Sequence, residues 1–439
     1  MQFTPEQVIS LAPDTASVKA GQKLASTAKW VARHQHEKAL WGACKGSGKN
    51  PYTTMIDLGD LAFKCSCPSR KFPCKHALGL LFLFASQPTS FSQTNELADF
   101  VAEWLNKRAG RTEKQAIKKT ANAKPVAAKA QQKRLVARTK KVEGGLLELR
   151  LWLKDVIRTG ILQVPNEGYN FSKNIIARMV DAQASGLARE LRAIEKINFY
   201  EEGWQQQLTK LLARLYFITE AYEQQAQLPK SLQAELRSLI GWTTPKEEVL
   251  AQEGMQDDWI ILSKQLEEED RIQVERLWLY GKTSRQFGLI LNFYGYNQVP
   301  QHTFVAGSTL KAELVPYPGA FPLRMLIKSQ AEMTTSFKEI SAATSILSMY
   351  EAFGQVAAIN PFITQFPVLL SNMSLVTATP HHCLRDQLGN LLVLQNSNEQ
   401  YWFTAAFSQG KPFSCFGIFE QNQFSLHAIW QGNQYHAIS

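Results

Sequence analysis

The chain has 439 residues, 45% of them hydrophobic and 10% aromatic, which is enough for two or three domains with buried cores. This composition excludes an intrinsically disordered chain, and no apolar run approaches the ~18–20 residues that a membrane-spanning helix needs. The net charge is +10, but Lys107 to Lys141 contributes +12 by itself, so the remaining residues together carry −2. The basic character therefore belongs to one segment, where a search for an acidic partner begins.

The first residues predict two helices followed by strands. Thr4 is suited to cap a helix, with Gln7 three residues after it to complete a capping box. Asp14 is expected to begin a second helix that runs to about residue 29. The pattern then predicts an extended segment over 30–44, a turn at 46–48 and a strand pair over 52–58 and 61–67.

Three cysteines and one histidine fall within twelve residues in the spacing C-x-C-x6-C-x-H, at Cys65, Cys67, Cys74 and His76. Zinc in a structural site takes four nitrogen or sulfur ligands in a tetrahedron, and Cys3His is one of its usual sets. Side chains two apart on a strand share a face, so Cys65 and Cys67 can point at one metal. Residues two apart on a helix diverge, so Cys74 is expected just before a helix that starts near His76.

This string resembles the SWIM zinc finger, whose pattern is C-x-C-x(n)-C-x-H on a strand–strand–helix unit. The resemblance implies that Cys65, Cys67, Cys74 and His76 are the ligands of one structural zinc ion. The segment 41–52 upstream is similar to the lead-in of stand-alone bacterial SWIM proteins. The resemblance is specific over residues 30–90 and looser over 1–105, and it implies a metal site without specifying a reaction.

Disulfide bonds are the main alternative for clustered cysteines, but they need an oxidising compartment. The N-terminus has neither a basic n-region nor an apolar h-region, so we expect a cytoplasmic protein with reduced thiols. Cys44 could approach the zinc, yet four ligands already complete the tetrahedron, so a packed free thiol is expected there. The basic rim that offsets three thiolates is expected to consist of Lys64, Arg70, Lys71 and Lys75.

Residues 76–84 predict a helix that is apolar on several faces and therefore needs cover from other elements. The expected cover comes from the two N-terminal helices, the first strand and a helix that follows the finger, through Val8, Ile9, Leu11, Leu24, Trp30, Leu97, Phe100, Val101, Trp104 and Leu105. Residues 1–106 are thus predicted to form one SWIM-type zinc finger domain, a ββα unit with covering helices.

The middle of the chain changes character twice. Residues 107–142 contain no aromatic and few large aliphatic residues, which predicts a basic flexible linker, partly helical at most. Over 143–245, apolar residues recur at spacings of three and four, as at Leu146, Leu149 and Leu153. This periodicity predicts a bundle of four or five helices.

Residues 246–439 are predicted to form a β-rich, antiparallel α+β domain, because the apolar period becomes two. One helix is expected at about 337–358, and a hairpin turn at Gly432-Asn433. The expected strands are Trp259–Leu262, Ile272–Tyr280, Phe287–Tyr294, Leu310–Val315, Leu323–Ile327, Leu391–Leu394, Tyr401–Ala406, Phe413–Phe419 and Phe424–Trp430. The whole chain is therefore predicted to be a multidomain α+β protein.

No catalytic motif accompanies the zinc site. Residues 46–49 and 281–283 each resemble part of a phosphate-binding loop but break its register, and hairpin turns explain both. His382 and Cys383, with Asp386 nearby, are nucleophile and ligand types, but adjacent strand residues point to opposite faces. Four protein ligands also leave a zinc ion no open position for water, so the protein is predicted not to be an enzyme.

Two functions are favoured over a third, an enzyme with its site in the C-terminal domain, which no motif supports. Bacterial proteins that resemble this one tend to be encoded beside MoxR-type AAA+ ATPases and von Willebrand A-domain proteins, which implies a protein-interaction adaptor. The large, neutral second half favours this hypothesis, since DNA binding alone would give it no role. The alternative is a sequence-nonspecific nucleic-acid-binding protein that uses Lys107–Lys141 and the finger rim. That segment lacks the aromatic side chains that stack on bases, so it would contact phosphates only.

Overall fold

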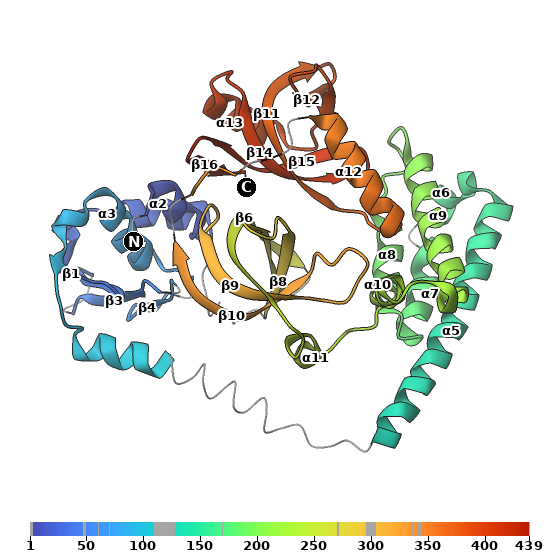
Figure 1. The fold of residues 1–439 in the computed structure, drawn as a ribbon, viewed down its shortest axis with the longest axis horizontal. Helices are drawn as coiled ribbons and strands as arrows, with labels where there is room; N and C mark the ends of the chain where they lie inside the picture. Colours follow the sequence, from blue (N-terminus) through green and yellow to red (C-terminus); the bar gives the residue numbers. More distant parts are fainter. Residues whose placement is uncertain are drawn as a thin grey trace. The chain divides into compact units, whose positions relative to one another are not determined.

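The computed structural model describes residues 3–46, 50–59, 61–69, 71–108, 128–168, 170–269, 272–295, 304–334, 337–340, 342 and 345–438. The chain divides into two compact units, one formed by Met1–Ala116, Gln252–Pro316 and Leu323–Ser439, and the other by Ile117–Ala251 and Tyr317–Pro322. The finer division into residues 1–106, 107–142, 143–245 and 246–439 stays a prediction. The predicted fold class is confirmed: a finger region of strands and helices, a central helical bundle and C-terminal antiparallel sheets (Figure 1).

The N-terminal helices begin where their capping residues predict. Helix α1 spans Pro5–Ser10, and its capping box is complete, because the Thr4 hydroxyl accepts the Gln7 N–H while the Gln7 side chain accepts the Thr4 N–H. Helix α2 spans Thr15–Gln22 and is capped by Asp14, whose carboxylate accepts the Ser17 N–H at 2.7 Å. It ends earlier than residue 29, because the chain turns at Leu24 to bring Trp30 into the sheet, and the Trp30 indole N–H bonds the Leu24 carbonyl at 2.9 Å.

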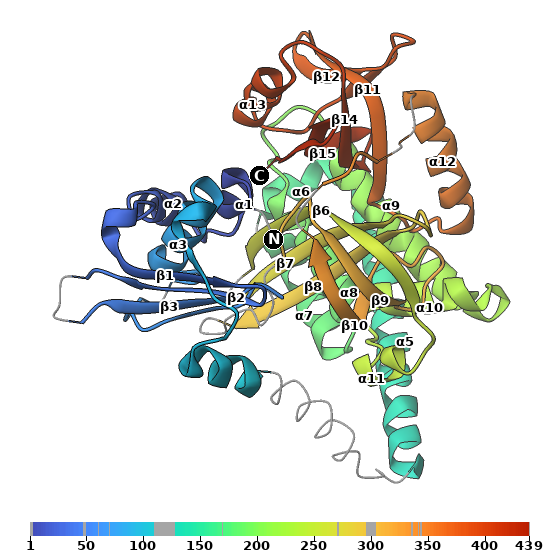
Figure 2. The ribbon, with the colours of Figure 1, turned by 60° about the vertical axis from the view of Figure 1, so that its left-hand side comes forward.

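The finger sheet has the strand order β4-β3-β2-β1-β5. Its strands are β1 (Trp30–His36), β2 (Ala39–Cys44), β3 (Tyr52–Asp57), β4 (Phe63–Cys65) and β5 (Ser92–Gln93). Helix α3 (Lys75–Ser86) begins within the Cys65–His76 motif and crosses one face of this sheet (Figure 2). The turn predicted at 46–48 lies mostly outside the described residues. The strand–strand–helix order predicted for the finger is present.

Helix α3 is buried from His76 to Phe84, nine consecutive residues. Strands β2 and β3 cover it through Leu40 and Ile56, while Val8, Leu11 and Trp30 of the predicted cover belong to the same buried cluster. This cluster continues into buried side chains of the second sheet. A helix that is apolar all round is thus enclosed by the rest of its unit, as its sequence requires.

Two parts of the predicted cover are wrong. Ile9 is 42% exposed, and the helix over residues 99–108 packs on the opposite face of the finger sheet from α3. There Val101 contacts a second buried cluster that includes Trp41 and Met55. The reason is strand alternation, because Trp41 and Met55 point away from the α3 face and form an apolar surface of their own.

The second unit is the helical bundle predicted from the period of three and four. Its helices are α5 (Ala128–Thr159), α6 (Val164–Glu167), α7 (Asn170–Asp181), α8 (Ser185–Arg192), α9 (Trp204–Glu223), α10 (Lys230–Ile240) and α11 (Lys246–Leu250). Helix α5 begins inside the segment predicted to be a linker, so residues 128–142 are helical throughout, and Val142 is fully buried. Residues 109–127 lie outside the described part of the chain.

The second sheet is antiparallel, with the order β10-β9-β6-β7-β8. All five of its strands were predicted, although most are longer than the predicted runs. They are β6 (Met255–Glu269), β7 (Ile272–Gly281), β8 (Phe287–Gly295), β9 (Thr309–Pro316) and β10 (Met325–Thr334).

The third sheet has the order β13-β12-β11-β14-β15-β16 and is also antiparallel. Its strands are β11 (Phe366–Ala378), β12 (His381–Arg385), β13 (Leu391–Val393), β14 (Phe413–Glu420), β15 (Gln423–Gln431) and β16 (Gln434–Ala437). Strands β11, β12 and β16 were not predicted, but the hairpin turn at Gly432-Asn433 is present between β15 and β16. Helix α12 spans Ile346–Ile359 and starts later than predicted.

The prediction of a strand at Tyr401–Ala406 is wrong, because these residues lie in helix α13 (Asn398–Ser408). The aromatic run favours a strand by propensity, but Ser397 and Gln400 form a complete capping box that starts a helix. No helix among the described residues combines the length and hydropathy that crossing a bilayer requires.

Candidate metal centre

The first two cysteines are placed by the edge of the finger sheet. Cys65 is the last residue of β4 and lies opposite Thr54 of β3. Cys67 lies beyond the strand, so the prediction that β4 runs on to Cys67 is wrong. Thr53 still bonds Ser66 twice, donating its N–H to the Ser66 hydroxyl at 3.0 Å and accepting the Ser66 N–H at 2.9 Å. This pair fixes the turn that brings Cys67 back beside Cys65.

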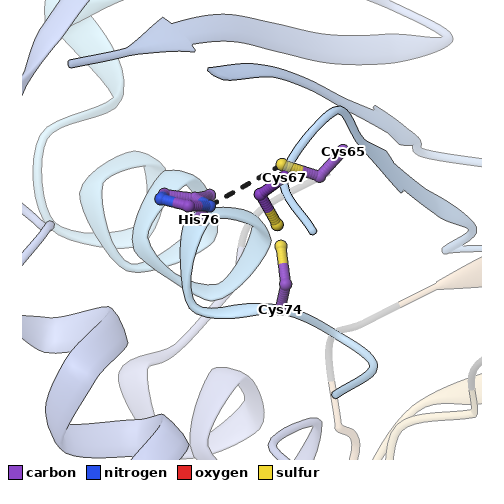
Figure 3. A group of neighbouring side chains, drawn as sticks. All are labelled: Cys65, Cys67, Cys74 and His76. Carbon is purple, nitrogen blue, oxygen red and sulfur yellow. Dashed lines mark hydrogen bonds between the residues drawn. The ribbon is translucent and has the colours of Figure 1, made fainter. Parts of the chain in front are cut away.

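The last two residues of the motif are placed by the start of α3. Cys74 is the N-cap residue, with extended backbone angles, and His76 is the second residue of the helix. This is the arrangement predicted from the C-x-H spacing, since a cap residue can point where a helical residue cannot. Figure 3 shows the three sulfur atoms gathered beside the His76 ring.

The four side chains form a compact group. One ligand atom from each of Cys65, Cys67, Cys74 and His76 lies within 4.8 Å of every other. The Cys65 Sγ and His76 Nδ1 atoms are 3.7 Å apart. Zinc bonds of about 2.3 Å to sulfur and about 2.0 Å to nitrogen imply tetrahedron edges of about 3.5–3.8 Å. The group therefore fits a zinc ion at its centre with only small side-chain adjustments.

Hydrogen bonding within the group favours one thiolate. A hydrogen bond from the Cys74 thiol, aided by His76 and Thr54, lowers the pKa of Cys65 to about 3. The same hydrogen bond raises the pKa of Cys74, and burial raises the pKa of Cys67. Thiolates are the species that bind zinc, so zinc binding must release the protons of Cys67 and Cys74.

Residues that the motif does not contain support the site from β3. The Tyr52 ring lies 4.8 Å from the His76 ring, and the fully buried Thr54 hydroxyl lies 3.3 Å from Cys65 Sγ. Sequence reasoning predicted the strand pair but missed both residues, because only the register of β3 against β4 places them at the motif. Cys44 is a buried free thiol opposite Tyr52, and its Sγ lies 3.7 Å from the Lys45 carbonyl oxygen.

Of the four residues predicted to form a basic rim, two are exposed cations without an ion pair in the structure's described part, and one pairs with an acid. Lys64 and Lys75 are exposed beside the motif, whereas Lys71 forms an ion pair of 2.7 Å with Asp14, the N-cap of α2. Lys71 also lowers the pKa of Asp14 to about 2. Arg70 lies outside the described residues. The Lys71–Asp14 pair ties the loop between Cys67 and Cys74 to α2.

The other sequence candidates do not form reactive sites. The carboxylate of Asp257 accepts the N–H groups of Thr283 and Ser284, so these donors of the 281–284 turn already have an acceptor. In β12, His382 stacks on Tyr401 at 3.7 Å while Cys383 is buried on the other face. Asp386 accepts the Ile346 N–H at the start of α12, next to the N-cap residue Ser345. Among the described residues, only the Cys3His group gathers three or more metal-ligand side chains.

Two family models match the chain. The SWIM zinc finger model matches residues 52–84, which include the whole motif and the strand before it. The chain carries a SWIM zinc finger. A second model, the SWIM-associated four-helix bundle domain, matches residues 137–240, which lie within the helical bundle described above. No curated protein and no solved structure matches the chain.

The SWIM finger of this protein has the donor set of a single structural zinc site. All four ligand positions of its C-x-C-x6-C-x-H pattern are occupied, and the structure brings these residues together. Zinc would draw the strand edge and the first turn of α3 together, with the thiolates of Cys65, Cys67 and Cys74 and the imidazole of His76 as ligands. A bound zinc ion would stabilise the fold at this point.

Proposed function

We propose that this SWIM protein is a non-enzymatic, cytoplasmic adaptor that uses a zinc-stabilised finger as part of a protein-interaction scaffold. The observation that carries the proposal is the closed donor set. Four protein side chains lie within 4.8 Å of one another, and two of them, Cys74 and His76, are buried. A catalytic zinc site keeps one position open for water, and this set would leave none.

The proposed partner belongs to a MoxR-type AAA+ ATPase system that includes von Willebrand A-domain proteins. The support is the resemblance to bacterial SWIM proteins together with the size of the chain outside the finger. Besides the finger, the chain contains two further sheets and a helical bundle, and an adaptor gives these parts a role.

The adaptor proposal is tested by co-purification from native cytosol. Tagged, zinc-loaded protein is expected to retain an AAA+ ATPase or a von Willebrand A-domain protein after nuclease treatment. The purified pair should then form a complex in size-exclusion chromatography. Loss of every protein partner after nuclease treatment would contradict the proposal. Recovery of hydrolytic activity that depends on the zinc ion would contradict its non-enzymatic part.

The second candidate, nonspecific nucleic-acid binding, is favoured by a different observation. Lys133, Arg134, Lys140 and Lys141 are all exposed along the first half of α5. A helix that presents several cations to solvent can lie against phosphates without reading bases. Residues 109–127 of the Lys107–Lys141 segment lie outside the described residues.

Salt dependence tests this second candidate. If these cations neutralise phosphates, log K for duplex DNA should fall linearly with log salt, by roughly 0.9 per phosphate contacted. Changing Lys133, Arg134, Lys140 and Lys141 to Gln should then remove most of the binding and flatten the slope, with zinc content unchanged. Equal, salt-resistant binding by wild type and variant would exclude this segment as the nucleic-acid surface.

A further inference from the structure

Among the described residues of α5, those on one side are exposed along most of the helix, although the helix belongs to a bundle. Val142, Leu146, Leu149 and Leu153 are buried and mark the side that faces the bundle. The opposite side carries exposed residues that recur at intervals of three, four or seven. We define these as the α5 seam: Lys133, Val136, Lys140, Leu147, Leu151, Lys154 and Arg158. At 3.6 residues per turn, this spacing keeps the seam on one face.

Neighbouring helices border the seam on both sides but leave it open. On one side α7 contacts α5, where Arg178 Nη2 bonds Glu148 Oε1 at 2.8 Å and an added Cβ on Gly145 would lie 2.5 Å from Ala182 Cβ. On the other side α9 contacts α5, where Arg150 forms ion pairs with Glu220 and Glu223. The seam lies between these two contacts.

Three apolar side chains in the seam are largely in water. Val136 is 53% exposed, Leu147 58% and Leu151 54%. Leu147 and Leu151 are four residues apart and so lie next to each other on the helix surface. Large apolar side chains in adjacent positions of an exposed helix face are the pattern by which one helix is recognised by another. The seam from Lys133 to Arg158 extends about 38 Å, long enough for a partner helix of several turns.

The charges of the seam limit what can cover it. Lys133, Lys140, Lys154 and Arg158 are exposed and basic, and Arg158 pairs with Asp155 at 3.3 Å. Glu143 is an exposed acid on the same side of the helix. A covering helix would therefore meet lysines above and below two leucines, and acidic side chains on it would complement them.

A second copy of the chain fits this face poorly. In a parallel pair each lysine would face its own equivalent, and in an antiparallel pair centred on Leu147, Lys140 would face Lys154. Both arrangements place like charges together. Nucleic acid fits only part of the face, because phosphates would pair with the lysines but leave Leu147 and Leu151 in water.

We propose that the α5 seam is the docking surface for an acidic amphipathic helix of the protein partner. Leu147 and Leu151 pack against apolar residues of that helix, and Lys133, Lys140 and Lys154 pair with its flanking Asp and Glu side chains. This inference rests on the proposed adaptor function and specifies which surface of the SWIM protein performs it.

A photo-crosslinker at the seam tests the proposal in the full, zinc-loaded chain. Benzoylphenylalanine replaces Leu147 in one variant and, as the matched control, Leu162 in another, because Leu162 is 67% exposed but lies outside α5. After irradiation in native cytosol, the Leu147 variant is expected to give an adduct whose peptide has acidic residues around apolar ones at spacings of three and four. The Leu162 variant is expected to give no such adduct.

A nuclease-sensitive adduct, an adduct to a second copy of this chain, or no adduct at Leu147 would each overturn the proposal. A partner that co-purifies with the chain but never crosslinks at Leu147 defeats the seam and leaves the adaptor function standing. If no partner co-purifies at all, the adaptor function itself fails.

The crosslinked segment, made as a labelled peptide, provides the quantitative test. L147D combined with L151D is expected to weaken its binding at least tenfold, and L162D to leave it unchanged. K133E, K140E and K154E together should weaken binding and reverse its dependence on salt. Melting temperatures and zinc content of all variants should match those of the wild type, and unchanged affinity in the seam variants would overturn the proposal.

Discussion

The finger helix α3 and the bundle helix α5 are stabilised in opposite ways. Helix α3 has 12 residues, nine of them buried in succession, and its N-cap is the metal-ligand residue Cys74. Helix α5 has 32 residues, and its described side chains, from Lys133 on, are buried mainly on one side. A 12-residue helix is marginal alone, so α3 depends on its zinc and on its neighbours, whereas α5 gains from length and from one packed face. Loss of the metal should therefore unfold the region around α3 and leave the helix α5 folded.

The largest expected effect is the loss of zinc. A Cys74→Ala variant should hold no zinc, because three ligands do not complete the site and structural zinc provides about 10–16 kcal/mol of binding energy that is also folding energy. We expect the finger to unfold while the bundle keeps its helical signal. Metal analysis and circular dichroism measure both effects.

The matched control for this variant is Cys44→Ala. Cys44 is a buried thiol outside the Cys3His group, so its loss should leave one zinc per chain. Full zinc content in Cys74→Ala, or loss of zinc in Cys44→Ala, would show that the ligand set is wrong.

Core truncations should produce the next largest effect, and their effect on zinc affinity should distinguish α3 from α5. Leu80→Ala in α3 and Leu149→Ala in α5 each remove a side chain with 0% exposure and should cost about 2–5 kcal/mol. Only Leu80→Ala should also weaken zinc, measured by competition with a chelator. Leu147→Ala, on the exposed side of α5, should change stability by less than about 0.5 kcal/mol. Equal loss of zinc affinity in both core variants would mean that the two regions fold as one.

Two adjacent glycines of α5 allow a finer test of its packing. An added Cβ on Gly145 would lie 2.5 Å from Ala182 Cβ, so Gly145→Ala should force the helices apart and cost about 1–3 kcal/mol. On Gly144 the nearest atom would be Arg178 Nη2 at 3.6 Å, so Gly144→Ala should stabilise the helix by about 0.5–1 kcal/mol. Denaturant unfolding of both variants distinguishes these signs, and the same sign in both would refute this account of the α5–α7 contact.

The smallest expected effect is the pH dependence of the bundle's stability. The hydrogen bond from Arg178 lowers the pKa of Glu148, so this pair stabilises the bundle above the unfolded pKa of the carboxyl group. Its contribution is lost as pH falls through the lower, folded pKa. Glu148→Gln should therefore melt slightly below the wild type at pH 7, and the two melting curves should converge in acid. A gap that persists at low pH would show that the ion pair is not the cause.

Acid should act on the finger by another route. There, falling pH protonates the thiolates and releases zinc, so the finger should lose its fold while the bundle loses only the contribution of such ion pairs. Zinc release followed across the same pH range as bundle melting separates the two processes.

The sequence by itself determined the features that depend on neighbours within a few residues. The four members of the metal site lie within one short string, and their spacing predicted a cap residue at Cys74 and a helix from about His76. The Thr4–Gln7 capping box and the helical period of the bundle are equally local. The Ser397–Gln400 capping box is a local signal of the same kind. The aromatic residues that follow it favour a strand by propensity, and the helix α13 was therefore predicted as a strand.

Only the tertiary structure decided what depends on distant pairing. The supports of the metal site, Tyr52 and Thr54, reach it through the register of β3 against β4, which the predicted strand pair did not specify. Residues 99–108 cover the face of the finger sheet opposite α3. Both faces of this sheet are apolar, and the sequence does not show which helix packs on which face. The open side of α5 was likewise undetermined, because periodicity shows which residues share a face but not which faces find a partner. Whether a side chain is buried depends on which elements pack against it, and the whole fold determines those elements.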